Sequence, residues 1–218
     1  MSPSNTLNLW QQHLGSVPDS VWDQEELETL ILADNDLTSI PDAIGRLTRL
    51  RTLDLGHNAL VEVPESIGRL VGLTDFLYLH DNQLSALPES IASLTRLRYL
   101  NLSENRFASM PASVCALRGL IELRMTDNVI EELPDDIGRL SNLRELHLRN
   151  NRLTTLPESI GGLQSLRQLD LRGNPLTNLP SALFALPRLE KLDLRWVPSL
   201  AMSRELALLE ERGCIVYR

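Results

Sequence analysis

The sequence predicts an α/β solenoid, a coil of similar stacked turns in which short strands alternate with helical turns. Three observations support this. Leucine and polar residues alternate within each turn, and an asparagine returns at one position of seven successive turns. A leucine also recurs with a period of 23 residues, at Leu27, Leu50, Leu73, Leu97, Leu120, Leu143, Leu166 and Leu189. A fixed period of this length is typical of repeat architectures, in which each turn buries its apolar face against its neighbours.

The turn from Leu143 to Leu163 shows how the pattern specifies structure. Its residues LRELHLRNNRLTTLPESIGGL follow the pattern LxxLxLxxNxLxxLPxxIxxL. Leu146 and Leu148 alternate with polar residues, which predicts a short strand with one buried face. The other apolar positions are spaced too widely for a strand, so they must point inward from a winding coil. Only stacked neighbours can bury all of them.

Asparagine and proline recur with the leucines and predict how each turn bends. The asparagines are Asn35, Asn58, Asn82, Asn105, Asn128, Asn151 and Asn174. An amide both donates and accepts, so stacked asparagines can pair the backbone groups that are freed where the strand ends. Proline, often followed by an acidic residue, recurs at Pro18, Pro41, Pro64, Pro88, Pro111, Pro134, Pro157 and Pro180. These positions predict 3₁₀ or one-turn helices on the convex side, ended by Gly45, Gly68, Gly138 and Gly161.

The repeats predict one domain over residues 1–218. Residues 7–26 form a degenerate N-terminal capping repeat, residues 27–188 seven full repeats, and residues 189–218 the last strand and a C-terminal cap. About nine short parallel strands are expected on the concave side of a horseshoe. In the cap, Ser203 is a candidate N-cap of a helix, and CIVYR is a candidate closing strand.

One repeat departs from the period. The step from Leu73 to Leu97 is 24 residues, so one additional residue lies among Thr74, Asp75 and Phe76. An additional residue within a strand produces a bulge. The sequence therefore predicts a distorted strand in this repeat.

These motifs resemble those of leucine-rich repeat proteins of the 23-residue class whose turns carry LPxxIxxL. The class includes Ras-suppressor-like and Scribble-like proteins, plant intracellular relatives and many bacterial proteins. The resemblance covers residues 7–197, and the ending ELALLEERGCIVYR is similar to endings of bacterial members. The resemblance implies a horseshoe that binds other proteins through its concave sheet. It also implies that the chain is a bacterial member of the class. The shared motif fixes scaffold positions only, so it implies no particular binding residue.

Composition restricts the partner and the compartment. A net charge of −8 disfavours nucleic acid as a partner, because phosphates repel an acidic protein. The start of the chain has no apolar run of signal-peptide length, and no membrane-spanning stretch follows, so no membrane partner is expected. Only Cys115 and Cys214 are present, without flanking cysteine-rich caps. We therefore expect a monomer in a reducing, cytoplasmic setting, or one secreted without a signal peptide if it is an effector.

Residues between the strand leucines are expected to face the concave surface and to bind the partner. The predicted binding residues are Ile31, Phe76, Tyr78, His80, Tyr99, Arg124, His147, Arg149, Arg172 and Arg195. The aromatic members gather in the middle of the chain. Exposed aromatic side chains among charged ones are typical of the centre of an interface. The alternative is that these rings pack on one another and simply cover the sheet.

Charge is distributed unevenly over the same surface. The first two-thirds are acidic, with Asp34, Asp36, Asp54, Asp81, Glu104 and Asp127, and the last third is rich in arginine. Arg149, Arg172 and Arg195 fall on adjacent strands, about 4.8 Å apart at the backbone, with Asp170 and Asp193 on the same face. Two interpretations follow: an internally paired ladder, or a site that captures an anion or a carboxylate.

The sequence predicts no catalytic, cofactor-binding or metal-binding residues. His57 and His80, near Asp34 and Asp81, lack a third nitrogen or sulfur ligand at zinc-type spacing. Cys115 lies beside core positions, with no base predicted near it. We therefore predict a non-catalytic protein–protein interaction module. The alternative is the recognition part of an enzyme system (a translocated effector, a kinase or a ubiquitin ligase) whose catalytic domain lies outside this chain.

Overall fold

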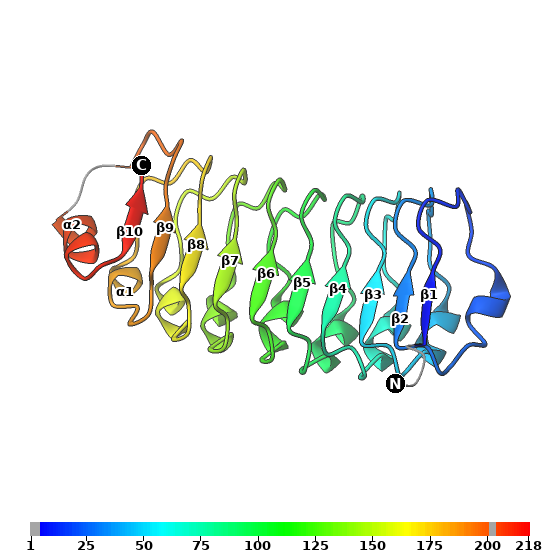
Figure 1. The fold of residues 1–218 in the computed structure, drawn as a ribbon. Helices are drawn as coiled ribbons and strands as arrows, with labels where there is room; N and C mark the ends of the chain where they lie inside the picture. Colours follow the sequence, from blue (N-terminus) through cyan, green and yellow to red (C-terminus); the bar gives the residue numbers. More distant parts are fainter. Residues whose placement is uncertain (1–4, 201–203) are drawn as a thin grey trace.

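The computed structural model describes residues 5–200 and 204–218, which form one parallel sheet with short helices behind it (Figure 1). The ten strands lie in the sheet in chain order, so each strand pairs with the next one. Their bounds are β1 (Thr6–Asn8), β2 (Thr29–Ile31), β3 (Thr52–Asp54), β4 (Phe76–Tyr78), β5 (Tyr99–Asn101), β6 (Glu122–Arg124), β7 (Glu145–His147), β8 (Gln168–Asp170), β9 (Lys191–Asp193) and β10 (Ile215–Tyr217).

The convex side carries one short helix per turn. Seven are 3₁₀ helices and the eighth is a single α-helical turn: η1 (Asp19–Val21), η2 (Asp42–Arg46), η3 (Glu65–Arg69), η4 (Glu89–Ser93), η5 (Ala112–Ala116), η6 (Asp135–Arg139), η7 (Glu158–Gly162) and α1 (Ser181–Phe184). Each begins directly after a proline, whose carbonyl accepts a hydrogen bond from the helix; the Ile44 N–H, for example, donates to the Pro41 carbonyl over 3.1 Å. The prolines therefore cap these helices, one position before the expected place.

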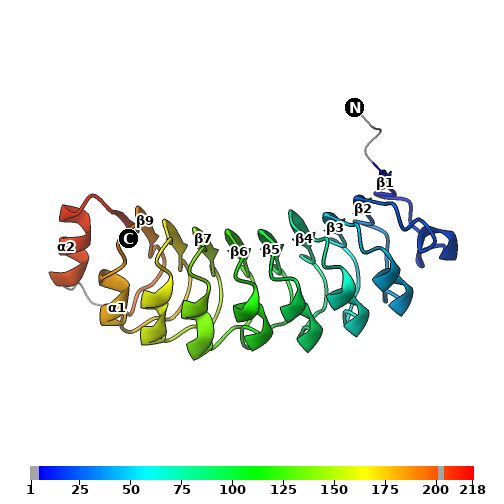
Figure 2. The ribbon, with the colours of Figure 1, turned by 90° about the horizontal axis from the view of Figure 1, so that it is seen from below.

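The sheet and the helices form a shallow arc with the strands on the inner side (Figure 2). This is the predicted solenoid with a concave parallel sheet and a helical convex side. Within the described residues, no helix combines the length and the apolarity that crossing a membrane requires.

The core is a continuous column of aliphatic side chains between sheet and helices. In the turn that begins at Leu143, the strand leucines Leu146 and Leu148 and the convex Ile160 are fully buried. Each buried side chain of this size contributes about 1.5–3 kcal/mol before the cost of conformational entropy. Because the same positions are filled in successive turns, each turn covers the apolar face of the one before it.

The asparagines pair backbone groups between turns, as predicted. The Asn128 carboxamide oxygen accepts a hydrogen bond of 3.1 Å from the Phe107 N–H in the preceding turn. Its amide nitrogen donates to the Leu102 carbonyl over 3.0 Å, and the side chain is 7% exposed. The pattern repeats along the solenoid, so this asparagine ladder satisfies groups that water does not reach.

The residue before each asparagine has a left-handed backbone conformation, and so do the equivalent residues before Gln12 and Val197 in the first and last turns. These residues, all with φ between 49° and 67°, are Gln11, Asp34, His57, Asp81, Glu104, Asp127, Asn150, Gly173 and Trp196. Aspartate and asparagine tolerate this region better than most residues, because their short polar side chains can hydrogen-bond locally. The backbone thus gives a structural reason for part of the acidic character of this column.

The glycines predicted to end the convex turns have a different role. None of the four has a left-handed φ. A Cβ atom on Gly68 would lie 2.4 Å from the Ser90 carbonyl oxygen, and one on Gly138 would lie 2.4 Å from that of Ser159. Glycine stands there because adjacent convex turns stack too closely for a side chain.

The predicted bulge in the 24-residue repeat is wrong. Strand β4 pairs in register with both neighbours, so that Leu77 lies opposite Leu53 on one side and Leu100 on the other. The additional residue lies in the irregular segment before the strand, at residues 73–75. Because only three residues per turn take part in the ladder, this connection absorbs a residue without breaking the pairing.

A helix and a strand cover the C-terminal end of the core, as predicted. Strand β10 extends the sheet beside β9, and α2 (Arg204–Glu211) buries Leu206 and Leu209. The Arg212 guanidinium donates hydrogen bonds to the carbonyls of Phe184 and Leu186, at 2.5 and 2.8 Å. These bonds tie the end of the helix to the preceding turn. The predicted N-cap residue, Ser203, lies outside the described residues.

Candidate protein-binding face

The concave face is built from three columns of side chains. The middle residue of each strand from β2 to β9 is a buried leucine, whereas Leu7 of β1 and Val216 of β10 are partly buried. Side chains alternate across a strand, so the first and third residues point away from the core. The residue two positions beyond the third forms another outward column. We call these the first, third and fifth positions of a turn.

Three aromatic side chains form a cluster near the middle of this face. Phe76 and Tyr78 of β4 and Tyr99 of β5 define this aromatic cluster. Their ring centroids lie 5.1 to 5.8 Å apart, within the range of favourable aromatic contacts. Phe76, the most apolar of the three, remains 42% exposed. The rings therefore do pack on one another, yet they leave an apolar surface open to solvent.

The two tyrosines of the cluster keep their protons at physiological pH. Burial raises the pKa of Tyr99 to about 12, with the nearby Glu122 carboxylate adding to the shift against the opposing charge of Arg124. Burial also raises the pKa of Tyr78, and the negative charges of Asp54 and Glu122 act in the same direction. Both phenols are thus neutral hydroxyl groups that can donate a hydrogen bond to a partner.

A pair of histidines adjoins the cluster. His80 packs edge-on against Tyr78, with ring centroids 6.0 Å apart, and its Nε2 lies 3.2 Å from Nε2 of His57. His57 is held by Asp81, with 2.6 Å between Nδ1 and the carboxylate. Burial and the neighbouring His57 lower the pKa of His80, and its buried Nδ1 has no hydrogen-bond partner within residues 5–200 and 204–218. Asp34, in contrast, accepts a hydrogen bond from Gln11.

The arginines of the last third are paired with aspartates of the same sheet. Arg172 forms a two-pronged contact with Asp170, at 2.8 and 2.5 Å, and Arg195 forms one with Asp193, at 3.0 and 2.8 Å. The second contact is deep, because Asp193 is only 2% exposed. The internally paired ladder is therefore confirmed. Free capture of an anion by this ladder is disfavoured, because carboxylates already occupy the guanidinium groups.

Two further arginines on this face also have acidic partners. Arg149 lies 3.0 Å from the Asp127 carboxylate, in the neighbouring turn. Arg124 Nε lies 2.5 Å from Glu122 Oε1, and its guanidinium carbon is 6.0 Å from the centre of the Tyr99 ring. Arg124 thus links the aromatic cluster to the acidic residues of β6 and β7.

Ile31 lies apart from the aromatic cluster. It occupies the third position of β2, and Asp54 of β3 separates it from Tyr78 of β4. The sequence predicted that Ile31 lies near the aromatic residues, because Ile31 and Tyr78 occupy the same position of their turns. The strand register places Asp54 between these two side chains. The predicted binding residues therefore divide into the aromatic cluster with His80, the paired arginines, the isolated Ile31, and His147, which lies beside two glutamates.

A pocket of about 310 Å³ opens beside the cluster, where strands β4 to β6 begin. Phe76, Tyr99 and Ile121 give it apolar walls, while Arg98 and Glu122 add opposite charges. The sequence did not predict Arg98, Ile121 or Glu122 as site residues. These residues lie just before a strand or at its first position. A prediction that included these positions, which also border the concave face, would have found them.

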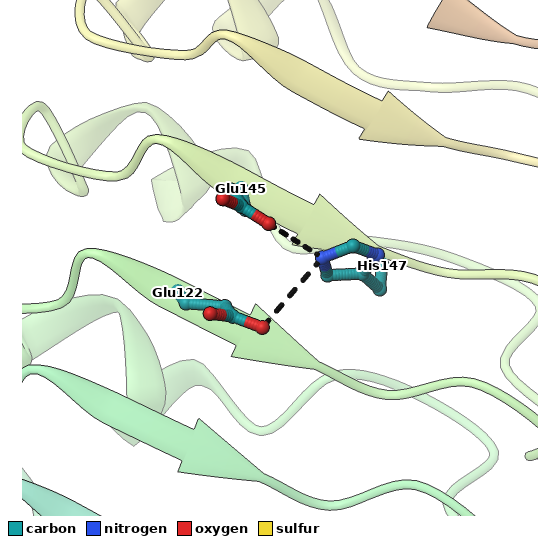
Figure 3. A group of neighbouring side chains, drawn as sticks. All are labelled: Glu122, Glu145 and His147. Carbon is teal, nitrogen blue, oxygen red and sulfur yellow. Dashed lines mark hydrogen bonds and ion pairs between the residues drawn. The ribbon is translucent and has the colours of Figure 1, made fainter.

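A second group that the sequence did not predict consists of Glu122, Glu145 and His147 (Figure 3). His147 Nε2 lies 3.2 Å from Glu145 Oε2 and 3.7 Å from Glu122 Oε1. Figure 3 shows the two carboxylates converging on the imidazole from adjacent strands. His147 is a predicted binding residue, but its two neighbours occupy the first position of the turn, where the sequence predicts only the aromatic residues Phe76 and Tyr99 as binding residues.

A long row of stacked turns with one open sheet face defines a repeat solenoid suited to recognition. Family models described as leucine rich repeat match residues 5–60, 118–176 and 142–196, and another matches residues 96–117. The first model matches more than half of the chain, and the chain belongs to the leucine-rich repeat family. No curated protein matches this sequence.

Solved leucine-rich repeat structures share the fold. A leucine-rich repeat protein of Leptospira interrogans has a TM-score of 0.78 and 26% identity, covering 99% of this chain and 66% of that one. The leucine-rich repeat ectodomain of the Arabidopsis thaliana receptor kinase GASSHO1/SCHENGEN3, in complex with CASPARIAN STRIP INTEGRITY FACTOR 2, has a TM-score of 0.75 and 33% identity, covering 87% of this chain and 24% of that one. The plant peptide hormone receptor RGFR1, in complex with RGF2, has a TM-score of 0.64 and 26% identity, covering 97% of this chain and 46% of that one. This chain thus spans less than two thirds of each.

Proposed function

We propose that this chain binds a protein partner through its concave face, with the aromatic cluster at the centre of the contact. The observation that carries the proposal is the exposed apolar surface of Phe76 beside two half-buried tyrosines. Buried aromatic anchors supply much of the binding energy in protein interfaces, and charged residues around them set orientation. The adjoining pocket, with its aromatic walls, fits an apolar side chain of the partner.

The comparisons support a protein or peptide as the class of partner. Two of the similar structures are complexes, one of a receptor kinase ectodomain with CASPARIAN STRIP INTEGRITY FACTOR 2 and one of a peptide hormone receptor with RGF2. The parallel is one of fold class, because the motifs of the family fix scaffold positions. We further propose a non-catalytic, monomeric, bacterial protein of the LPxxIxxL class, with no nucleic-acid or membrane partner.

The proposed location is a reducing, cytoplasmic one. Cys115 and Cys214 are both free thiols in this structure, and both are buried. Burial raises the pKa of Cys115 to about 11, with Asp136 adding to the shift, so this thiol is protonated and unreactive at neutral pH. Fractionation of cells that express the native protein would test the location, and recovery outside the cell would favour a secreted effector.

A second proposal is that the chain is the recognition part of an enzyme system. The similarity to the ectodomain of a receptor kinase favours it, because there a leucine-rich repeat region belongs to a larger catalytic protein. The neighbouring coding sequence tests it: a kinase, ligase or secretion gene fused or adjacent to this one supports it, and an isolated gene contradicts it.

The main proposal is tested by affinity capture with matched variants. The concave variant is Tyr78→Ala combined with Tyr99→Ala, and the convex control is Glu89→Ala combined with Asp135→Ala. The two control residues are exposed, lie on η4 and η6, and have no side-chain hydrogen bond or ion pair among the described residues. We expect the concave variant to lose the captured protein and the control to retain it, with melting profiles showing that both fold. The reverse result would place the contact on the convex side.

A further inference from the structure

We propose that Glu122, Glu145 and His147 bind a divalent transition-metal ion such as Zn²⁺ on the concave face (Figure 3). The three side chains bring one nitrogen and two carboxylate oxygens together, all within 4.8 Å of one another. Imidazole and carboxylate are common zinc ligands.

The backbone fixes the relative positions of the three ligands. Glu122 of β6 and Glu145 of β7 lie directly opposite each other in the parallel ladder, and His147 follows Glu145 by two residues on the same face. Their side chains are 21%, 34% and 17% exposed, respectively, so all three are largely covered by their neighbours. The ligands therefore project from rigid neighbouring strands, and little ordering is needed for them to converge.

Two of the three distances between the ligand atoms are close to those around a shared ion, and the third, between the two carboxylates, lies within 4.8 Å. A zinc ion binds nitrogen and oxygen at about 2.0–2.2 Å, which separates two tetrahedral ligands by about 3.4 Å. His147 Nε2 is 3.2 Å from Glu145 Oε2 and 3.7 Å from Glu122 Oε1. Side-chain shifts of a few tenths of an ångström would bring both pairs to the required separation.

The ligand set also favours one class of metal. Mg²⁺ and Ca²⁺ prefer six or more oxygen ligands, whereas a neutral imidazole suits zinc and related transition metals. Three protein ligands leave at least one coordination position open. This position faces the concave side, where water or a carboxylate or imidazole group of a bound partner could complete the shell.

Arg124 competes with the ion for the same carboxylate. Its Nε lies 2.5 Å from Glu122 Oε1, the oxygen that also faces His147. Metal binding must therefore displace the guanidinium or turn Glu122 to offer its other oxygen. In either case the positive charge of Arg124 opposes the ion, so removal of that charge should tighten metal binding. A group of side chains that serves only as an ion-pair network would not show this response.

Titration calorimetry with Zn²⁺ on the purified chain of residues 1–218 tests the proposal. We expect one ion per chain in the wild type. His147→Asn and Glu145→Gln should each weaken binding at least tenfold, Arg124→Gln should strengthen it severalfold, and Mg²⁺ should not compete. The control is His57→Asn combined with His80→Asn, which removes the other close pair of imidazoles and should leave the affinity unchanged.

Folding of the variants is checked by their melting profiles without metal. Zn²⁺ should raise the melting temperature of the wild type and of the His57/His80 control but not that of His147→Asn. Zinc binding that survives His147→Asn, or that is lost with the histidine-pair control, would overturn the proposal. So would the absence of binding in the wild type, which would leave His147 as an ion-pair partner of two carboxylates.

Discussion

At the residue scale, the acidic residues before the asparagines are explained by their backbone conformation, although acidic residues on the concave face could also indicate a binding surface. Asp34, Asp81 and Asp127 make this column acidic, and each has a positive φ. Their chemistry is explained by tolerance of the left-handed region. Glu104 occupies the same position with φ 55° but lacks the short side chain that suits it. The site is therefore a candidate for relief of strain.

Glu104→Asp should raise the free energy of unfolding by about 0.5 kcal/mol, because aspartate is the better residue in the left-handed region. Urea unfolding would measure the change. The same substitution at Glu62, which is exposed and does not have a positive φ, is the control and should bring no gain. Equal shifts at both sites would show that the backbone conformation is not the cause.

Leu148 and Arg149 are consecutive residues on opposite faces of the sheet: Leu148 points into the core, and Arg149 lies on the concave surface. Leu148→Ala should lower the free energy of unfolding by about 2–5 kcal/mol, because it removes a fully buried leucine from the column. Arg149→Ala should cost much less, because this side chain is 37% exposed and pairs at the surface. Denaturant melts that show equal losses would mean that the faces have been assigned in reverse.

At the element scale, the asparagine ladder is the device that allows the chain to leave each strand. Asn128→Ala would leave the buried Phe107 N–H without its side-chain partner, whereas the Leu102 carbonyl would keep the hydrogen bond from Asn105. An unsatisfied buried group costs about 1–3 kcal/mol, so the free energy of unfolding should fall by about that amount. Asn178→Ala is the matched comparison, because Asn178 is exposed, does not have a positive φ and has no side-chain hydrogen bond among the described residues. A loss of similar size in both variants would contradict the role of the ladder.

The arginine–aspartate pairs at the C-terminal end should make stability sensitive to acid. Burial alone would raise the pKa of Asp193, but hydrogen bonds from Arg195 and the charges of Arg172 and Arg195 outweigh it, so the pKa is lowered. A carboxyl whose pKa is lower in the folded state stabilises the fold above its unfolded pKa, near 3.9. That contribution is lost as the pH falls through the folded pKa.

The wild type should therefore lose more stability than Asp193→Asn when the pH is lowered from about 6 to 3. Denaturant midpoints at several pH values would measure this difference. An identical acid response in the two proteins would show that the carboxylate contributes nothing through its ionisation.

The strands and helices that follow the 23-residue period could be predicted from the sequence. The structural effect of the one 24-residue repeat could not. The leucine period determines the strands, the convex helices and the terminal cap, because every turn must bury the same apolar positions. The period showed which repeat holds the additional residue, but that residue lies at positions 73–75, before the strand, and does not distort it. Three-residue strands leave most of each turn outside the ladder, and the sequence does not show which part absorbs an insertion.

At the scale of the whole molecule, the sequence predicts which side chains lie on the concave face but not which of them form ion pairs or hydrogen bonds with one another. The columns predicted that Phe76, Tyr78 and Tyr99 would meet, because their turns are consecutive. The columns did not predict with which carboxylate each arginine forms an ion pair, or that His147 lies beside the carboxylates of Glu122 and Glu145. Such choices depend on side-chain rotamers within a known column, and several partners lie within reach of each long side chain.

Site-specific photo-cross-linking tests whether a protein partner binds at the exposed aromatic cluster. One photoreactive residue would replace Asn101, which lies opposite Tyr78 in the ladder and two residues beyond Tyr99; another would replace Glu89 on the convex η4. With both proteins at the same concentration in native lysate, the concave probe should cross-link a protein partner, and excess unlabelled wild-type chain should abolish the product. Cross-linking from Glu89 with none from Asn101 would contradict the proposed concave contact.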